Sequence, residues 1–433
     1  MARKMKDSGI EWIGEIPEGW EIVPVRSCFD EVRTKNTDGQ EQNALQFKSG
    51  NIISKTNFNA SMDDYVADTI TNYTVVLPDT VMINGLNLNY DFKSLRVALV
   101  KEKGVITSAY LAIFPDRKKI SPQYATYLFK GYETKMAFHN MGAGIRKTLG
   151  YKEFKNQPLL LPSEKEQNKI SVYLDSKCSH IDIMLSKIRS SIEEYKKLKQ
   201  AVITQAVTKG VRGEREMKDS GIDWIGKIPK EWGITKIKSG VTKIGSGKTP
   251  SGGAETYTDS GVIFLRSQNV YDCTLNLESP TYISPEVDAT MKSTRVLPDD
   301  VLLNITGGSI GRCSIVPKTL GLANVNQHVC IIRTNPLIFL PKYMQYFWVS
   351  TLGHLAIDLY QTGGNREGMS ADAIRNTPIP YAPLNEQKEI ADYLDAKCAE
   401  IDGLIAKKEQ LVKELESYKK SLIYEVVTGK REV

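Results

Sequence analysis

The chain has 433 residues, too many for one ordinary hydrophobic core, so we expect two domains and a connecting element. Its formal net charge of +6 permits a nucleic-acid partner without requiring one. No window approaches the ~18–20 apolar residues that span a bilayer, and the N-terminal stretch lacks the apolar segment of a secretory signal.

Cysteine and histidine usage argues against a zinc site. The six cysteines include no C-x-x-C pair, and only four histidines are present. We therefore expect no metal ion and a cytoplasmic protein with reduced thiols.

One long stretch of the sequence occurs twice. Residues 5–20 read MKDSGIEWIGEIPEGW, and residues 217–232 read MKDSGIDWIGKIPKEW. The agreement continues at later positions, where 77–84 matches 297–304, 144–146 matches 364–366, and 166–178 matches 386–398. A tandem duplication is the simplest explanation.

Each copy starts with a region of mixed strand and turn signals. Residues 97–100, 263–265 and 329–332 are short apolar runs bounded by Gly, Asn and Pro. These runs predict α/β (α+β) heads at about 15–160 and 227–380. The predicted domain limits are 1–160 and 213–380, with helical regions at 161–212 and 381–433.

Each copy ends in a long amphipathic helix. Apolar residues recur at heptad spacing: Ile181, Leu185, Ile188, Ile192 and Val202 in the first tail, and Ile401, Ile405, Val412, Leu415 and Leu422 in the second. Lys199 interrupts the first stripe, and Lys419 interrupts the second at the equivalent position. Ser163 followed by Glu166 predicts a capping box for the first helix, whereas Pro383 occupies the matching place in the second copy.

A single apolar stripe must be buried, and the simplest partner for each tail is the other tail. Equivalent helices that pair through equivalent faces predict an antiparallel coiled coil with pseudo-two-fold symmetry. About 26 residues at ~1.5 Å each give roughly 40 Å, close to one turn of B-DNA at ~34–36 Å. The alternative is that each tail packs on its own head.

Motifs for catalysis are fragmentary. Residues 245–249 contain Gly-Lys-Thr, but Thr242 occupies the position of the first P-loop glycine, and Pro250 prevents the helix that should follow. Residues 115–118 and 298–300 lack the further acid and lysine of a metal-dependent nuclease. Pro-Pro, part of the loop that grips a flipped base in methyltransferases, does not occur. We expect no catalytic residues.

The heads instead offer polar and cationic side chains interleaved with glycine and aromatic residues. Asn and Gln can bond adenine through two hydrogen bonds, and Arg can bond guanine in the same way. Many of these residues could equally serve turns and caps. The DNA-contacting candidates are Asn84, Asn87, Tyr90, Lys93, Arg96, Ser108, Tyr110, Arg146 and Lys147 in the first copy, and Lys248, Thr249, Arg266, Gln268, Asn269, Asn304, Thr306, Ser309, Arg312, Asn326, Gln327, His328 and Arg366 in the second.

Several motifs follow one another in a defined order. They are the openings at 7–17 and 219–229, residues 245–250, 266–269, 303–311 and 324–329, and the Glu-Gln pairs at 166–167 and 386–387. In this order the chain resembles the specificity (S, HsdS) subunits of Type I restriction–modification systems. The first copy departs from the pattern at 85–87, where Gly-Leu-Asn replaces Thr-Gly-Gly.

The resemblance implies a division of labour. Each head would be a target recognition domain reading one half of a split site in double-stranded DNA, and the paired helices would set the gap. Two methyltransferase (M) subunits would dock on helices and heads and methylate adenine, and restriction (R) subunits would join for cleavage. S-adenosylmethionine, ATP and Mg would be used by these partners, and this chain would bind no cofactor.

Three alternatives to this reading remain open. One is a tandem-repeat DNA-binding regulator that acts without enzyme partners. Another is a specificity subunit of a different restriction–modification type, and the third is a hydrolase whose site is not recognisable from the sequence.

Overall fold

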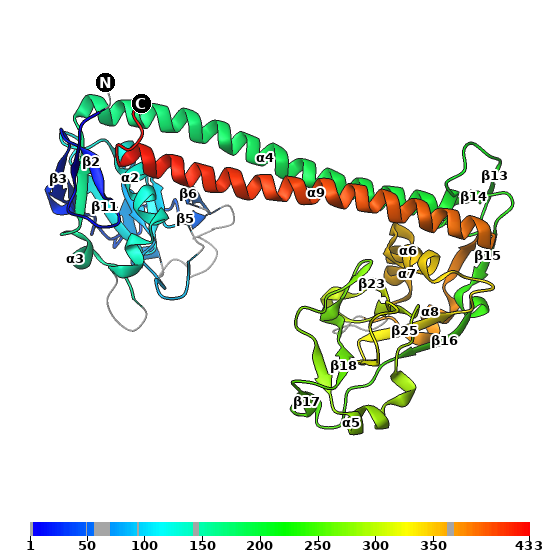
Figure 1. The fold of residues 1–433 in the computed structure, drawn as a ribbon. Coiled ribbons are helices and arrows are strands. Elements are labelled where there is room, and N and C mark those ends of the chain that lie inside the picture. The colour runs from blue at the N-terminus through cyan, green and yellow to red at the C-terminus, as the bar shows by residue number, and fades with distance from the viewer. Residues whose placement is uncertain (1–2, 49, 56–69, 93–94, 142–146, 362–367) are drawn as a thin grey trace. The chain divides into compact units, whose positions relative to one another are not determined.

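The computed structural model describes residues 3–48, 50–55, 70–92, 95–141, 147–361 and 368–433. Its contacts divide the chain into two units. The first is formed by Met1–Arg189 with Gln410–Val433, and the second by Ser190–Glu409. Each unit contains one α/β head together with segments of two long helices (Figure 1).

The first head is built on an antiparallel four-stranded sheet in the order β4 (Phe29–Glu31), β11 (Leu111–Pro115), β8 (Val81–Ile83), β9 (Val97–Leu99). Four small antiparallel pairs surround it: β1 (Met5–Asp7) with β2 (Glu15–Pro17), β3 (Glu21–Pro24) with β12 (Pro158–Leu161), β5 (Leu45–Lys48) with β6 (Asn51–Ser54), and β7 (Thr74–Val76) with β10 (Gly104–Ile106). Among its described residues, the helices include α2 (Pro122–Thr134) and the short α3 (Tyr151–Phe154).

The second head repeats this plan with an added sheet. Its equivalent sheet has the order β16 (Val241–Ser246), β25 (Val329–Thr334), β22 (Val301–Asn304), β23 (Cys313–Ile315). The added sheet has the order β17 (Tyr257–Thr258), β21 (Thr281–Ile283), β18 (Val262–Leu265), β24 (Ala323–Val325), with β18 and β24 parallel.

Smaller elements complete the second head. The small pairs are β13 (Met217–Asp219) with β14 (Lys227–Pro229), β15 (Gly233–Lys236) with β26 (Pro378–Tyr381), and β19 (Val270–Tyr271) with β20 (Thr274–Leu275). The helices of this head are α5 (Pro285–Thr290), α6 (Pro341–Val349), α7 (Thr351–Tyr360) and α8 (Ala371–Asn376).

The central strands β8 and β22 are buried on both faces. Val81 and Ile83 of β8 join one hydrophobic cluster, while Met82 between them joins another. Leu302 of β22 likewise packs in a different cluster from its neighbours. A strand buried on both faces needs a continuous apolar run rather than an alternating one, which explains the repeated apolar residues after Leu-Pro-Asp in both copies.

The long helices are α4 (Glu164–Lys209) and α9 (Leu384–Val427), and they pair in each unit. In the first unit Lys419 bonds Asp182 at 2.6 Å and Arg189 bonds Glu416. In the second unit Lys199 bonds Asp402 at 2.7 Å, and Lys408 lies 5.5 Å from the ring centroid of Tyr195. Numbers rise along α4 as they fall along α9, so the predicted antiparallel pairing is confirmed within each unit.

The predicted apolar stripe lies in the interior of the helix pair. Five of its residues are buried, namely Ile181, Leu185, Ile192, Ile401 and Leu422, and the other five, Ile188, Val202, Ile405, Val412 and Leu415, are half-buried. Ile181, Leu185 and Leu422 also belong to the core of the first head. The alternative of tails packed on heads therefore holds in part, because one stripe serves both contacts.

The repeated opening motif fastens the start of each long helix to its head. Trp20 donates its indole N–H to Glu166 at 2.9 Å, and Trp232 donates to Glu386 at 2.9 Å. Arg3 bonds Glu166 in the first copy, as Arg215 bonds Glu386 in the second. The duplicated tryptophan is thus a structural anchor.

The expected capping box is wrong because the Glu166 carboxylate accepts from Trp20 and Arg3. The backbone amide of Glu166, in the first turn of α4, donates to the Ser163 carbonyl. The amides of Glu386 and Gln387 donate to the Pro383 carbonyl in the same way. Proline can therefore stand at position 383 where the first copy has Ser163, because only the backbone carbonyl of this residue accepts hydrogen bonds from the helix.

Candidate nucleic-acid interface

Three loops of the second head meet in one chain of hydrogen bonds. The Thr249 hydroxyl donates to the Gln327 side chain, and Gln327 Nε2 lies 3.1 Å from His328 Nε2. His328 Nδ1 lies 2.6 Å from the Thr306 hydroxyl. The loops follow β16, precede β25 and follow β22, so the sheet brings together residues that are distant in sequence. Gln327 is exposed and offers donor and acceptor groups of the kind that read base edges.

The Gly-Lys-Thr run of this head does not form a phosphate loop. It leaves strand β16, and Pro250 and a short 3-10 turn at Gly253–Thr256 follow instead of an α-helix. A Cβ atom at Gly247 would lie 2.0 Å from the Val325 carbonyl oxygen, so only glycine allows this approach. Lys248 and Thr249 are held at the surface by this close packing.

Asn304 joins two of the candidate loops from inside. It is fully buried, and its Nδ2 donates to the Ser267 carbonyl at 2.8 Å and to the Ser309 hydroxyl at 3.1 Å. Its Oδ1 atom is buried without a partner among the described residues. The predicted role of Asn304 as a direct DNA contact is contradicted by its burial, and its contacts are those of a brace.

Asn269 is also a structural residue rather than a direct contact. It is 5% exposed, accepts the Arg266 amide at 2.9 Å and donates to the Asn276 carbonyl at 3.0 Å. Asn326 is 8% exposed and accepts the His328 amide at 3.2 Å. Both amides shape the loops that carry the exposed Gln268 and Gln327.

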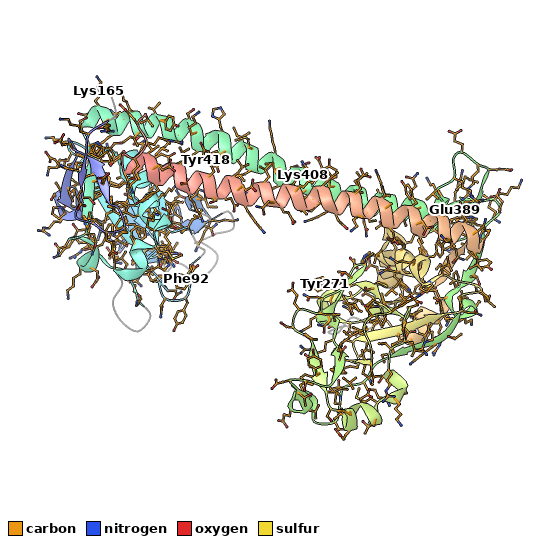
Figure 2. The ribbon with its side chains drawn as sticks, viewed as in Figure 1. Phe92, Lys165, Tyr271, Glu389, Lys408 and Tyr418 are labelled. Atoms are coloured by element: carbon orange, nitrogen blue, oxygen red, sulfur yellow. The ribbon has the colours of Figure 1, made fainter. Side chains whose placement is uncertain are left out.

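Two arginines of the second head lie over tyrosine rings. Arg312 lies 4.6 Å from the ring centroid of Tyr271, and Arg266 lies 5.5 Å from that of Tyr257. Sequence reasoning selected the arginines but missed the tyrosines, since no spacing in the sequence joins them. Figure 2 shows Tyr271 at the surface of this head.

The first head has a different loop in the same place. The Arg96 side chain is 1% exposed and donates to the carbonyls of Asn84 and Leu86 at 2.9 Å each, and to that of Asp91. The expectation that Arg96 contacts DNA is therefore contradicted, because its guanidinium is occupied by the backbone. A buried arginine thus holds this turn of the first head, whereas Asn304 holds the equivalent loop of the second head.

Around this turn the first head exposes aromatic rings. Tyr90 is 73% exposed and Phe92 is 57% exposed. Phe92 stacks on His139 with ring centroids 5.0 Å apart. Phe92 and His139 were missed from the sequence, because an isolated aromatic residue in a polar loop carries no periodic signal. Asn87, with φ of 53°, is exposed beside them.

The remaining candidates are dispersed. The Ser108 hydroxyl bonds Lys35 and Thr74. The Tyr110 ring packs against that of Phe47 in β5, with ring centroids 5.7 Å apart. Lys147 is exposed. Lys93, Arg146 and Arg366 lie outside the described residues.

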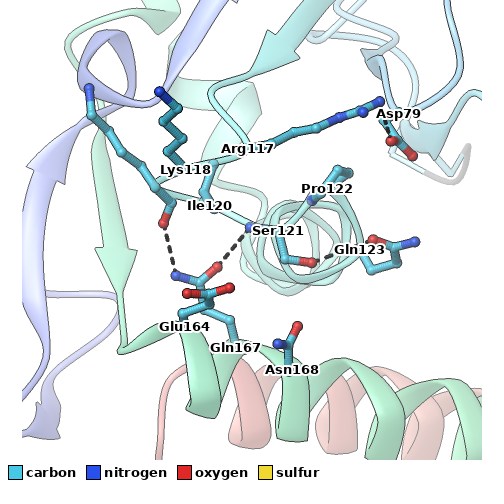
Figure 3. Close-up of a pocket in the computed structure, with 11 residues that line it drawn as sticks. Asp79, Arg117, Lys118, Ile120, Ser121, Pro122, Gln123, Glu164, Gln167 and Asn168 are labelled. Carbon is cyan, nitrogen blue, oxygen red and sulfur yellow. Dashed lines mark hydrogen bonds and ion pairs between the residues drawn. The ribbon is translucent and has the colours of Figure 1, made fainter.

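An open depression of about 240 Å³ lies beside the start of α4 in the first unit (Figure 3). Gln167 fills its floor, accepting the Ser121 amide at 2.8 Å and donating to the carbonyls of Lys119 and Pro162. Gln387 makes the same three backbone bonds in the second unit. The backbone satisfies every polar group of Gln167, so this side chain connects the start of α4 to the head and leaves no polar group for a ligand.

The described residues contain no group of three or more His, Cys, Asp or Glu side chains arranged to hold a metal ion. Among the same residues no helix is long and apolar enough to cross a membrane. Burial raises the pKa of the Cys273 thiol to about 12, and burial also raises that of Cys330 to about 12. These thiols therefore lack the thiolate character of nucleophiles.

Comparison with known proteins points to one family. Residues 229–414 match the family model of the Type I restriction modification DNA specificity domain. The specificity subunit of the type I restriction enzyme MjaVIII from Methanocaldococcus jannaschii is 24% identical over 428 residues, covering 96% of this chain and 93% of that protein.

This chain is similar over nearly its whole length to Type I restriction–modification specificity subunits.

Two solved structures share the fold of this chain. The first, from work on complex assembly and conformational transition of the type I R-M system, gives a TM-score of 0.71 at 15% identity, with 96% of this chain and 99% of that chain covered. The HsdS subunit from Thermoanaerobacter tengcongensis gives 0.51 at 15% identity, with 98% and 100% covered. The predicted fold class and the predicted resemblance to this family are thus confirmed.

Proposed function

We propose that each head of this specificity subunit reads one half of a bipartite DNA site, while the chain itself catalyses nothing. The observation that carries the proposal is the chain of hydrogen bonds through Thr249, Gln327, His328 and Thr306. It presents polar groups of three loops on one surface of the second head. Such a surface suits direct reading of base edges.

The two heads share a scaffold but present different loops. The second head carries Thr306 and neighbouring glycines where the first carries a turn held by Arg96. A shared sheet that carries different loops supports the reading of two different half-sites. Each mismatched base pair costs about 1–3 kcal/mol, so two short half-sites read together supply useful discrimination.

The paired helices are proposed to set the gap between the half-sites and to dock two methyltransferase subunits, with restriction subunits joining for cleavage. Those partners would supply S-adenosylmethionine, ATP and Mg chemistry. Linking two weak readers through a stiff connection raises the effective concentration of the second reader once the first has bound.

Co-expression with the methyltransferase subunits, followed by mapping of methylated adenines, tests this function. A two-part motif with a constant gap is expected. Exchange of residues 15–160 for the corresponding head of a related subunit should alter one half of the motif only. Alteration of both halves would contradict the modular reading, and tight sequence-specific binding by a chain that never associates with a methyltransferase would favour the regulator.

Gln327→Ala tests the second head directly. It should weaken binding to one half-site by about 5- to 100-fold while leaving the other half unchanged. Lys230→Ala is the matched control, because this exposed lysine pairs with Glu216 in the β13–β14 hairpin, outside the reading loops. An equal effect of the two variants would show that Gln327 contributes no sequence information.

A further inference from the structure

Arg96 and Arg312 occupy the same position in the two heads. Arg96 immediately precedes β9, and its carbonyl accepts the Asn84 amide at 2.8 Å. Arg312 immediately precedes β23, and its carbonyl accepts the Asn304 amide at 2.9 Å. The duplicated hairpin therefore places one arginine at the base of the same loop in each copy.

The two side chains take opposite directions. In the first head the guanidinium turns inward and binds three backbone carbonyls. In the second head the buried Asn304 braces the loop by bonding Ser267 and Ser309. The bracing role is thus filled without Arg312, whose side chain is half-buried and lies over Tyr271.

The cation–π contact with Tyr271 leaves the N–H donors of Arg312 unused. A guanidinium stacks through its flat face, while its five N–H donors point outward in the plane. Among the residues that the structure describes, none forms a side-chain hydrogen bond or ion pair with Arg312. The contact with the ring therefore holds the guanidinium in place without consuming its donors.

The neighbouring groups place this arginine within the reading surface. The Arg312 amide donates to the Ser309 carbonyl at 3.2 Å, which closes the loop that carries Thr306. Thr306 is the last member of the hydrogen-bonded chain through His328 and Gln327. Tyr271 is 39% exposed, so the stacked pair reaches the surface.

We infer that Arg312 is a specificity-determining residue of the second head and that it reads a guanine in its half-site. This inference rests on the proposed function. Guanine presents O6 and N7 as two acceptors in the major groove, and a planar arginine fork matches them with two parallel bonds. An arginine held on an aromatic platform is oriented before binding, whereas a phosphate contact needs no fixed plane. The first head has no such reader at this position.

The test is selection of bound sequences by the specificity subunit in complex with its methyltransferase subunits. The first half-site is kept constant and the second half-site is randomised. The wild-type complex should select a guanine at one position of the second half. Arg312→Ala should abolish that preference, lower affinity for the selected sequence by about 10- to 100-fold, and leave the other positions unchanged.

Further variants separate the contribution of the Tyr271 ring from that of the Arg312 guanidinium. Tyr271→Phe keeps the ring and should keep the guanine preference, whereas Tyr271→Ala should reduce it with Arg312 still present. Arg312→Lys should lose most discrimination, because an ammonium group cannot form the planar pair of bonds. Lys318→Ala, at an exposed lysine of the same head, is the charge-matched control and should retain the preference.

Contrary outcomes are distinct from one another. A uniform loss over all sequences with a shallower salt dependence would identify a phosphate contact and overturn the inference. An unchanged guanine preference in Arg312→Ala, or a wild-type second half-site without guanine, would overturn it as well. A wild-type complex without any sequence preference would instead refute the proposed function. Matching unfolding curves of wild type and Arg312→Ala exclude misfolding as the cause.

Discussion

Lys199 and Asp402 form an ion pair between the two long helices, with Nζ of Lys199 2.7 Å from the carboxylate. Lys419 and Asp182 form the equivalent pair, and the two pairs are related by a shift of 220 positions in each residue. Each lysine interrupts an apolar stripe, and 23% and 28% of the two lysine side chains is exposed. A charge in that place is satisfied in only one register of the antiparallel helices, so the pairs specify alignment more than they add stability.

Reversal of one charge should therefore loosen the helix pair. Lys199→Asp places two carboxylates together and should lower stability by about 1 kcal/mol, since the Asp402 side chain is half in solvent and screening limits the effect. The double variant with Asp402→Lys should recover most of the loss. Thermal unfolding at low and high salt measures both, and a double variant no more stable than the single one would contradict a specific pair.

Loss of the Glu386 carboxylate should lower the free energy of unfolding much more than loss of Glu389, an exposed glutamate one turn away. Only 2% of its side chain is exposed, and it binds Trp232 and Arg215. Glu386→Ala leaves a largely buried arginine and an indole N–H without partners, which costs roughly 3–5 kcal/mol. Glu389→Ala removes a pair with Arg212 that is about half exposed and should cost less than about 1 kcal/mol. Urea unfolding that gives equal losses would refute the anchoring role of the tryptophan motif.

The first unit should be more stable in mild acid than at neutral pH because of Glu133. Burial raises the pKa of Glu133 to about 7, although the Arg96 amide and the nearby Arg96, Lys130 and Lys420 charges act against the shift. The folded state then binds a proton that the unfolded state has released, so stability falls as pH rises from roughly 4.5 to 7. The contribution is on the order of 1–3 kcal/mol.

Glu133→Gln should remove this pH dependence and stabilise the unit at pH 7–8. The glutamine oxygen can still accept the Arg96 amide, a bond of 2.6 Å. Glu11→Gln, at an exposed glutamate of the same unit, is the control and should change nothing. A persisting slope in chemical unfolding between these pH values would show that another group is responsible.

Lengthening both helices should lengthen the unread gap. Lys408 lies 5.5 Å from the ring of Tyr195, so positions near 194 and 409 face each other. Seven residues inserted at both places add about 10 Å, equivalent to about 3 base pairs. Mapping of methylated adenines should show the same half-sites farther apart. The same insertion near Glu278, between β20 and β21, should leave the gap unchanged, and an unchanged gap in the helix variant would refute the helices as a spacer.

The amino-acid sequence determined the architecture because the duplication and the heptads are local, repeated signals. Residues 97–99, 263–265 and 329–332 lie in strands as expected, and of the three predicted runs only Val100 falls outside a strand. Short apolar runs between turn residues have few alternatives. The matching registers of Ile181 and Ile401 predicted equivalent buried faces on two long helices. Even the two off-pattern lysines were visible as a pair of equivalent interruptions.

Individual roles in the heads depended on tertiary structure. Arg96 and Arg312 are the same residue at the same place in the repeat, yet one is buried among carbonyls and the other lies on Tyr271. Asn304 and Gln327 are similar amides, but the first is buried and the second is exposed. Burial and partners come from strands and loops far apart in the chain, and no local pattern encodes which side of a turn a polar side chain will face.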